Sequence, residues 1–140
     1  MKNINKFVPR ILATLIVMIV LSMIITSTVL AANYNGTWVN NNQSTRGMVK
    51  FTIEPGTFQG YGQCQPTPCD WKTTPLILYS KSISDSNDIA GIAEYNFGFS
   101  KDIITLKMIS PTLIEANHYT QFTDGSGRHN FVETGMFKRQ

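Results

Sequence analysis

Residues 102–122 read Asp-Ile-Ile-Thr-Leu-Lys-Met-Ile-Ser-Pro-Thr-Leu-Ile-Glu-Ala-Asn-His-Tyr-Thr-Gln-Phe. Ile104, Leu106 and Met108 alternate with polar residues, which is the two-residue period of a β-strand with one buried face. Ser110-Pro111 is a turn signal, and the residues after it again mix apolar and polar side chains. This stretch therefore predicts two consecutive antiparallel strands joined by a short turn.

Strand alternation and turn signals repeat along the rest of the chain. Val49, Phe51 and Ile53 alternate with polar residues, and beyond residue 32 no segment has a long apolar stripe at helical spacing. Eight consecutive strands with short links predict an all-β, up-and-down antiparallel sheet, and closing it into a small barrel removes its exposed edges. A sandwich is the alternative. The predicted strands are 34–41, 46–54, 57–64, 70–80, 89–98, 102–109, 112–122 and 129–139.

The first 31 residues have the composition of a secretory signal. Basic residues come first, an apolar run at 11–25 follows, and small residues precede a cleavage site after Ala31, with Ala32 as the neighbouring choice. We therefore expect a signal-peptide helix over 1–31 and secretion of a single domain over 32–140. The alternative is a membrane anchor through 11–25, although this run is shorter than the ~20 residues that a spanning helix usually needs.

Loss of this segment changes the electrostatics. Of the 12 Lys and Arg residues, Lys2, Lys6 and Arg10 lie within it, whereas all 9 Asp and Glu residues lie beyond it. The remaining chain is therefore neutral, and it shows no Lys/Arg cluster. A nucleic-acid-binding surface needs a basic face. We expect no nucleic-acid partner, and contact with a membrane only through the N-terminal segment if that segment stays uncleaved.

The only two cysteines, Cys64 and Cys69, flank a spacer with two prolines. The spacing is not the Cys-x-x-Cys of redox motifs, and no further cysteine is present to complete a zinc site. In an oxidising compartment we expect a Cys64–Cys69 disulfide. The bridge would close a short loop and fix where Asp70 and Trp71 point at its exit.

Asp70 and Trp71 are the first candidates for a binding site. Trp71 would be a stacking platform for a sugar or another flat ligand, with Asp70 accepting hydrogen bonds from it. In the alternative interpretation, Trp71 packs on the barrel and Asp70 accepts hydrogen bonds from backbone N–H groups of the loop.

Catalytic signals are absent from the sequence. His118 and His129 are the only histidines. With Glu115 or Glu133 they could form an acid–base or metal site, but single histidines on strands are most often surface residues or satisfied core residues. The serines lack the context of a nucleophile elbow, and no pair of carboxylates has surroundings like those of a glycosidase. We expect no catalytic residues, no bound metal and no cofactor.

Gly36-Thr37-Trp38 stands at the start of the first strand predicted after the signal. A Gly-x-Trp there, followed by a meander of strands, resembles the calycin group, which includes lipocalins, fatty-acid-binding proteins and avidins. The resemblance implies that Trp38 plugs one end of the barrel and that Lys138 or Arg139, from the last strand, packs across it. The alternative is an ordinary buried tryptophan and a terminal basic residue in solvent.

A second set of residues resembles a family of small secreted bacterial β-barrel modules. That resemblance implies a barrel in an extracytoplasmic location, and it brings no known substrate. The family has Gly after the Asp-Trp pair, where this chain has Lys72; if that Gly has a positive φ, the loop exit differs here. The joint presence of Asp70 and Arg128 suggests that Arg128 pairs with Asp70 or another carboxylate and ties the last hairpin to the disulfide loop, which makes Arg128 a third candidate for ligand binding. The matching residues are Trp38-x-Asn40, Gly62-Gln63-Cys64-x-Pro66-Thr67-x-Cys69-Asp70-Trp71, Phe122-Thr123-Asp124-Gly125-Ser126-Gly127-Arg128-x-Asn130-Phe131, Glu133 and Phe137.

Together these features favour a secreted, non-catalytic binding module. It would hold a small apolar molecule or a sugar at the barrel mouth or near Trp71, because eight strands enclose only a narrow interior. The alternative is a protein-interaction module, such as an enzyme inhibitor that inserts the disulfide loop 64–69 into its partner.

Overall fold

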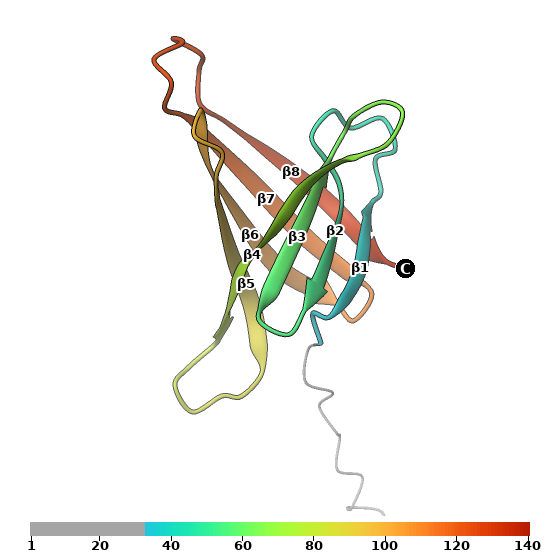
Figure 1. The fold of residues 1–140 in the computed structure, drawn as a ribbon. Coiled ribbons are helices and arrows are strands. Elements are labelled where there is room, and N and C mark those ends of the chain that lie inside the picture. Colours follow the sequence, from blue (N-terminus) through green and yellow to red (C-terminus); the bar gives the residue numbers. More distant parts are fainter. Residues whose placement is uncertain (1–32) are drawn as a thin grey trace, which may run out of the picture. The chain divides into compact units, whose positions relative to one another are not determined.

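The alternating segments form eight strands in the computed structural model, which describes residues 33–140 (Figure 1). The predicted signal-peptide helix lies outside the described residues. Every observed strand end lies within two residues of the predicted one. The strands are β1 (Gly36–Asn40), β2 (Met48–Glu54), β3 (Thr57–Gly62), β4 (Cys69–Ser80), β5 (Asp88–Asn96), β6 (Ser100–Ser110), β7 (Leu113–Phe122) and β8 (Phe131–Arg139).

The strands close into an antiparallel up-and-down barrel. Each strand pairs with the next in the sequence, and β1 pairs with β8. The pairing is uneven: β6 and β7 share ten residue pairs, whereas β1 and β8 share three, Trp38 with Arg139, Val39 with Lys138, and Asn40 with Phe137. The predicted all-β barrel is confirmed, and the sandwich is excluded.

The up-and-down order sorts the loops to two ends. The β1–β2, β3–β4, β5–β6 and β7–β8 loops lie at one end, which we name the mouth, and the other three turns lie at the opposite end, which we name the closed end (Figure 1). Within residues 33–140, no helix has the length and hydropathy needed to cross a membrane.

The closed end is filled by side chains. Trp38, Phe51 and Phe58 are fully buried, and their rings stack in sequence, with centroids 6.3 Å apart for Trp38 and Phe51 and 5.1 Å apart for Phe51 and Phe58. The ring of Phe137, on β8, also packs on Phe51, with the two ring centroids 4.8 Å apart. Buried aliphatic side chains complete this core: Ile53, Ile104, Leu106 and Ile114. The interior of this half is therefore occupied.

Arg139 seals the closed end. Its guanidinium lies 4.5 Å from the ring centroid of Trp38, within cation–π range. Its Nη1 donates to the carbonyl of Asn35 at 2.6 Å, its Nε donates to the carbonyl of Pro111 at 3.1 Å, and its Nη2 donates to the carbonyl of Asn33. The basic residue that packs across Trp38 is therefore Arg139, and Lys138 is exposed.

Candidate functional site

A cavity of about 530 Å³ opens at the mouth of the barrel. Its walls are largely aromatic and come from β4, the β5–β6 turn, β7 and β8. Its floor is polar, formed by Asp102, His118 and Thr120, with Glu133 beside them. The disulfide and Arg46 also line it. The aromatic wall residues are Trp71, Phe97, Phe99, Phe122 and Phe131.

Trp71 points into the barrel between the filled core and the cavity. Its ring centroid lies 5.9 Å from that of Tyr95 and 6.1 Å from that of Phe97, both edge to face, and 5.1 Å from that of His118. The indole lies against Gly60 on β3, where a Cβ would come within 2.5 Å of the ring. Trp71 therefore packs on the barrel, as the alternative interpretation predicted, and it also lines the cavity. Its stacking on a ligand stays a prediction.

A β-bulge sets the direction of Trp71. Gln59 pairs with Thr73 and Tyr61 with Asp70, so two residues of β4 lie opposite the single residue between them on β3. The second of those two is Lys72, with φ 68°. Lys72 therefore adopts the left-handed conformation that glycine favours, although it carries a Cβ.

Tyr95 locks this bulge in place. Its hydroxyl donates to the carbonyl of Lys72 at 2.8 Å and accepts the N–H of Gly60 at 3.0 Å. Burial raises the pKa of Tyr95 to about 12, so the hydroxyl keeps its proton at neutral pH. One side chain of β5 thus satisfies backbone groups of both β3 and β4 where their ladder is interrupted.

The disulfide is formed as predicted, and it holds the loop between β3 and β4. The Cα atoms of Cys64 and Cys69 are 5.4 Å apart. Asp70, next in the chain, is exposed and does not line the cavity. Its Oδ1 accepts hydrogen bonds from Gln59 Nε2 and from the backbone N–H of Lys72, each at 2.8 Å. The Gln59 bond is the main cause that lowers the pKa of Asp70. Asp70 therefore has the structural role of the two that we considered.

Arg128 pairs with another carboxylate, Asp124, and not with Asp70, so the expected tie to the disulfide loop is absent. Its Nη2 donates to Asp124 Oδ2 at 2.6 Å and its Nε to Ser126 Oγ at 2.8 Å. The guanidinium also lies 3.8 Å from the ring centroid of Phe122. Asp124 lies four residues before Arg128 in the β7–β8 loop. Because this carboxylate is close by, the local ion pair forms instead of a long-range one. The residue braces the outer side of the aromatic wall.

The floor of the cavity is built around the buried carboxylate of Asp102. Its Oδ2 accepts hydrogen bonds from His118 Nε2 at 2.5 Å and from Thr120 Oγ1 at 2.8 Å, and its Oδ1 accepts one from Ser100 Oγ at 2.6 Å. Burial by itself would raise the pKa of Asp102, but these three hydrogen bonds outweigh it and hold the pKa below its usual range. Asp102 is therefore ionised, and His118 Nε2 carries the hydrogen between them.

The other ring nitrogen of His118 has no hydrogen-bond partner within residues 33–140. His118 is only 7% exposed, and the nearest charged oxygen to Nδ1 is Oε2 of Glu133, 4.0 Å away. Gly47 leaves room for the Glu133 carboxylate, because a Cβ at Gly47 would overlap it. A polar cavity of about 230 Å³ under the β1–β2 loop is lined by the same two side chains. His118 and Glu133 thus form the wall between two cavities.

The sequence did not identify this floor. His118 was expected to lie at the surface or to be a satisfied core residue, and it is instead buried and half satisfied. Ile104 and Leu106 are buried at alternate positions of β6, and Asp102 lies on the same face, two residues before Ile104. His118 lies two residues after the buried Ala116, on the same face of β7. An acidic residue and a histidine on inward positions of neighbouring strands were the available signal.

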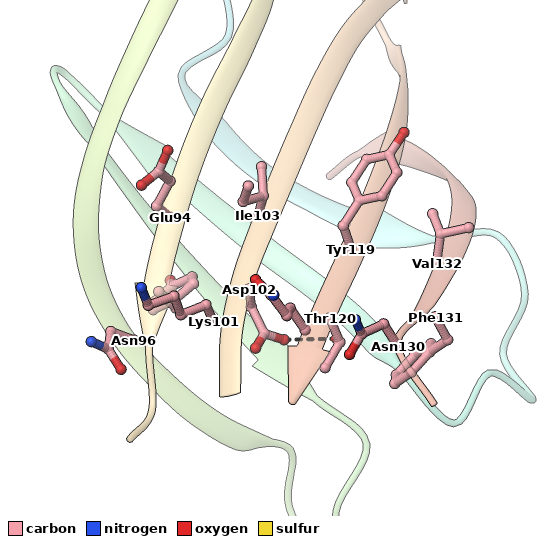
Figure 2. Close-up of a pocket in the computed structure, with 12 residues that line it drawn as sticks. Glu94, Asn96, Lys101, Asp102, Ile103, Tyr119, Thr120, Asn130, Phe131 and Val132 are labelled. Carbon is pink, nitrogen blue, oxygen red and sulfur yellow. Dashed lines mark hydrogen bonds between the residues drawn. The ribbon is translucent and has the colours of Figure 1, made fainter. Parts of the chain in front are cut away.

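A second concave surface lies on the outside of the barrel. Glu94, Ile103, Tyr119 and Val132 are register partners across β5, β6, β7 and β8 and stand side by side in Figure 2. They line a groove of about 810 Å³. The groove is larger than the mouth cavity, and Asp102 and Thr120 line both. His118, with its unpartnered nitrogen, lines the mouth and not the groove.

Comparisons with protein-family models, with curated proteins and with solved structures find no match to this chain. Within the part of the chain that the structure describes, no group of three or more His, Cys, Asp or Glu residues is placed to hold a metal ion. The chemistry of the site is therefore argued from its own residues.

Proposed function

We propose that the protein is a secreted, non-catalytic binding module whose mouth cavity holds a small molecule with an apolar body and one polar group. The observation that carries this proposal is the unpartnered Nδ1 of His118 at the floor of an aromatic cavity. A buried polar atom without a partner costs about 1–3 kcal/mol, and a ligand that supplies the partner recovers that cost.

The size and lining of the cavity support this proposal. Small-molecule sites usually have volumes of about 300–1,000 Å³, apolar walls and a few placed polar groups. The mouth cavity, about 530 Å³ with aromatic walls and polar groups on its floor, fits that description. The closed end is filled by side chains, so the mouth is the half of the barrel that has room.

The disulfide supports the extracytoplasmic part of the proposal. Disulfides persist in oxidising compartments and are rare in the cytosol, and Cys64–Cys69 is formed. The proposed signal segment over 1–31 would deliver the domain there.

A fragment screen by ¹⁵N NMR, with aromatic molecules and sugars, tests the function. Binding should shift the resonances of residues that line the mouth, such as Trp71 and His118. Two exposed aromatics give a matched pair of variants: Phe99, 50% exposed, lines the mouth, and Tyr119, 46% exposed, lines the outer groove. We expect Phe99→Ala to weaken binding and Tyr119→Ala to leave it unchanged. The reverse result would move the site to the outer groove, and no binding at millimolar concentrations would reject the function.

The disulfide loop is the basis of the second candidate function, a protein-interaction module. Its residues Gln65, Pro66, Thr67 and Pro68 are all exposed. A rigid exposed loop pays less entropy on binding than a flexible one. A Cys64→Ser/Cys69→Ser double variant separates the two functions, because a loop-mediated complex should weaken while fragment binding in the mouth persists.

A further inference from the structure

We infer that the ligand of the mouth cavity presents a primary ammonium group to His118 and Glu133, so that the module binds small organic cations with an apolar body. This inference rests on the proposed function and names the chemical class of its ligand.

His118 offers an acceptor to the ligand. Asp102 is ionised and receives hydrogen bonds from Ser100, Thr120 and His118 Nε2, so it has no hydrogen to give. Nε2 must therefore carry the hydrogen of the 2.5 Å bond. We take the imidazole as neutral, so that only one ring nitrogen is protonated and Nδ1 keeps a free lone pair. A group that satisfies Nδ1 must be a hydrogen-bond donor.

Glu133 also requires a hydrogen-bond donor from the ligand. Its Oε2 lies 4.0 Å from Nδ1, too far for a hydrogen bond between them. Because both atoms are acceptors, a single group placed between them has to donate at least two hydrogens. Water and an ammonium can do so, and a single hydroxyl cannot. The ammonium has a third hydrogen and a charge opposite to that of Glu133, so it is the group that these atoms suit best.

The remaining charges around the cavity agree with a cation. The cavity is lined by two carboxylates, Asp102 and Glu133, and by one guanidinium, Arg46, together with His118. Among residues 33–140, Arg46 forms no ion pair with either carboxylate. A ligand carboxylate placed against His118 would meet the negative charge of Glu133 directly and that of Asp102 behind the imidazole.

The aromatic walls complete the site. The Trp71 ring centroid is 5.1 Å from that of His118, so a cation at Nδ1 is near an indole, the ring that attracts cations most strongly. Phe97, Phe99 and Phe131 line the cavity further out and would contact an apolar body.

Three probes with one body and different head groups test the inference: 3-phenylpropylamine, 3-phenylpropanol and 3-phenylpropanoate. Dissociation constants come from ¹⁵N NMR titration of the domain at pH 7. We expect the amine to bind about tenfold more tightly than the alcohol, because its charged hydrogen bonds are the stronger ones, and the acid to bind most weakly. Glu133→Gln should reduce the preference for the amine to about twofold or less. Glu54→Gln should keep it, because Glu54 is exposed at the end of β2 beside the closed end.

The outcomes separate this inference from the proposed function. If the alcohol binds in the mouth as tightly as the amine, or if the preference for the amine survives Glu133→Gln, the ammonium site is rejected and the binding module remains. If the acid binds most tightly, His118 donates from Nδ1 as an imidazolium, which also rejects it. If other fragments bind in the mouth and the three probes do not, the inference is wrong. If nothing shifts the resonances of the mouth, both proposals fail.

Discussion

Asp102 is the residue on which the floor of the mouth depends. A buried carboxylate is costly unless it is paired and hydrogen-bonded, and three side chains meet that demand here. The same bonds fix the orientation of His118 and decide which of its nitrogens carries a hydrogen. The residue that defines the site is therefore one that lies beneath the ligand position.

Replacement of Asp102 by Asn should reveal this role through its pH dependence. At pH 7 we expect Asp102→Asn to lower the free energy of unfolding by about 3 kcal/mol, because the amide carries no charge and turns a donor toward existing donors. Since the folded-state pKa of Asp102 is lowered, its stabilisation is complete above the ordinary carboxyl pKa of about 4 and is lost as the pH falls through the folded value. Urea unfolding between pH 3 and 8 measures the difference. A gap between wild type and variant that stays constant down to pH 3 would contradict the prediction.

Lys72 carries backbone strain that a glycine would relieve. Its φ of 68° costs an L-residue about 1 kcal/mol of folded-state free energy. A glycine would remove that cost but would lose more backbone entropy on folding, and this loss offsets only part of the gain. We expect Lys72→Gly to raise the free energy of unfolding by about 0.5–1 kcal/mol. Lys72→Ala serves as the control: it keeps the Cβ and loses only the exposed contact with Asp70 at 3.4 Å, so its stability should stay near that of wild type. Equal stability of the Gly and Ala variants would refute the strain.

At the scale of elements, the β3–β4 connection combines a disulfide, a bulge and a glycine-lined strand. The disulfide closes the loop, the bulge turns Trp71 inward, and Gly60 and Gly62 leave room for its indole. None of these devices alters the strand order. They act on the direction of one side chain, which is why this connection belongs to the site as much as to the fold.

The double variant Cys64→Ser/Cys69→Ser should keep the barrel and lose a modest part of its stability. A loop with a sequence separation of only 5 residues predicts a loss of about 2 kcal/mol, because short loops have little closure entropy to remove. Chemical unfolding measures the loss, and amide NMR shifts should be confined to the neighbourhood of the β3–β4 loop. Shifts spread over the β6–β7 hairpin would show that the disulfide supports more than its loop.

The elements were predictable from sequence because strand alternation is a local signal. Residues 102–122 show it plainly, and the observed β6 and β7 match it within two residues. The disulfide and the pairing of Trp38 with a basic residue of the last strand were also predictable. The choice of Arg139 depends on which of two adjacent side chains faces inward, and the sequence left both open.

The polar floor was not predictable to the same degree because it depends on contacts between strands. Asp102 and His118 are 16 residues apart and meet only once the register of β6 and β7 is set. Arg128 shows the opposite case. The motif residues suggested a partner far away in the sequence, whereas the guanidinium pairs with Asp124 in its own loop. Register and local competition are both properties of the folded chain.

At the scale of the whole molecule, the barrel is divided into a filled half and an open half. Aromatic and aliphatic side chains fill the closed end, and the polar floor marks where that packing stops. Arg139 closes the filled half by joining β8 to the segment before β1. Stability and the proposed binding would therefore be separated along the barrel axis, so variants at one end should have little effect at the other.

Variants of two neighbouring basic residues test whether Arg139 closes the filled half of the barrel. Arg139→Met should lower the free energy of unfolding by about 2 kcal/mol, because it removes the cation above Trp38 and its hydrogen bonds to three carbonyls. Lys138→Met, the matched control on the exposed side of the same strand, should change it by less than about 0.5 kcal/mol. Thermal unfolding with Trp fluorescence measures both. Equal losses would show that Arg139 does not seal the barrel.

The short seam between β1 and β8 sets the order in which the barrel is completed as the chain is made. The residues of β8 that pair with β1 are 137–139, and β8 is synthesised after all the other strands. Until β8 emerges from the ribosome, β1 and β7 each have an unpaired edge and the Trp38 indole has no guanidinium above it. A ribosome stalled with β8 still in its tunnel would hold an open, curved sheet, and the release of β8 would convert that sheet into a ring.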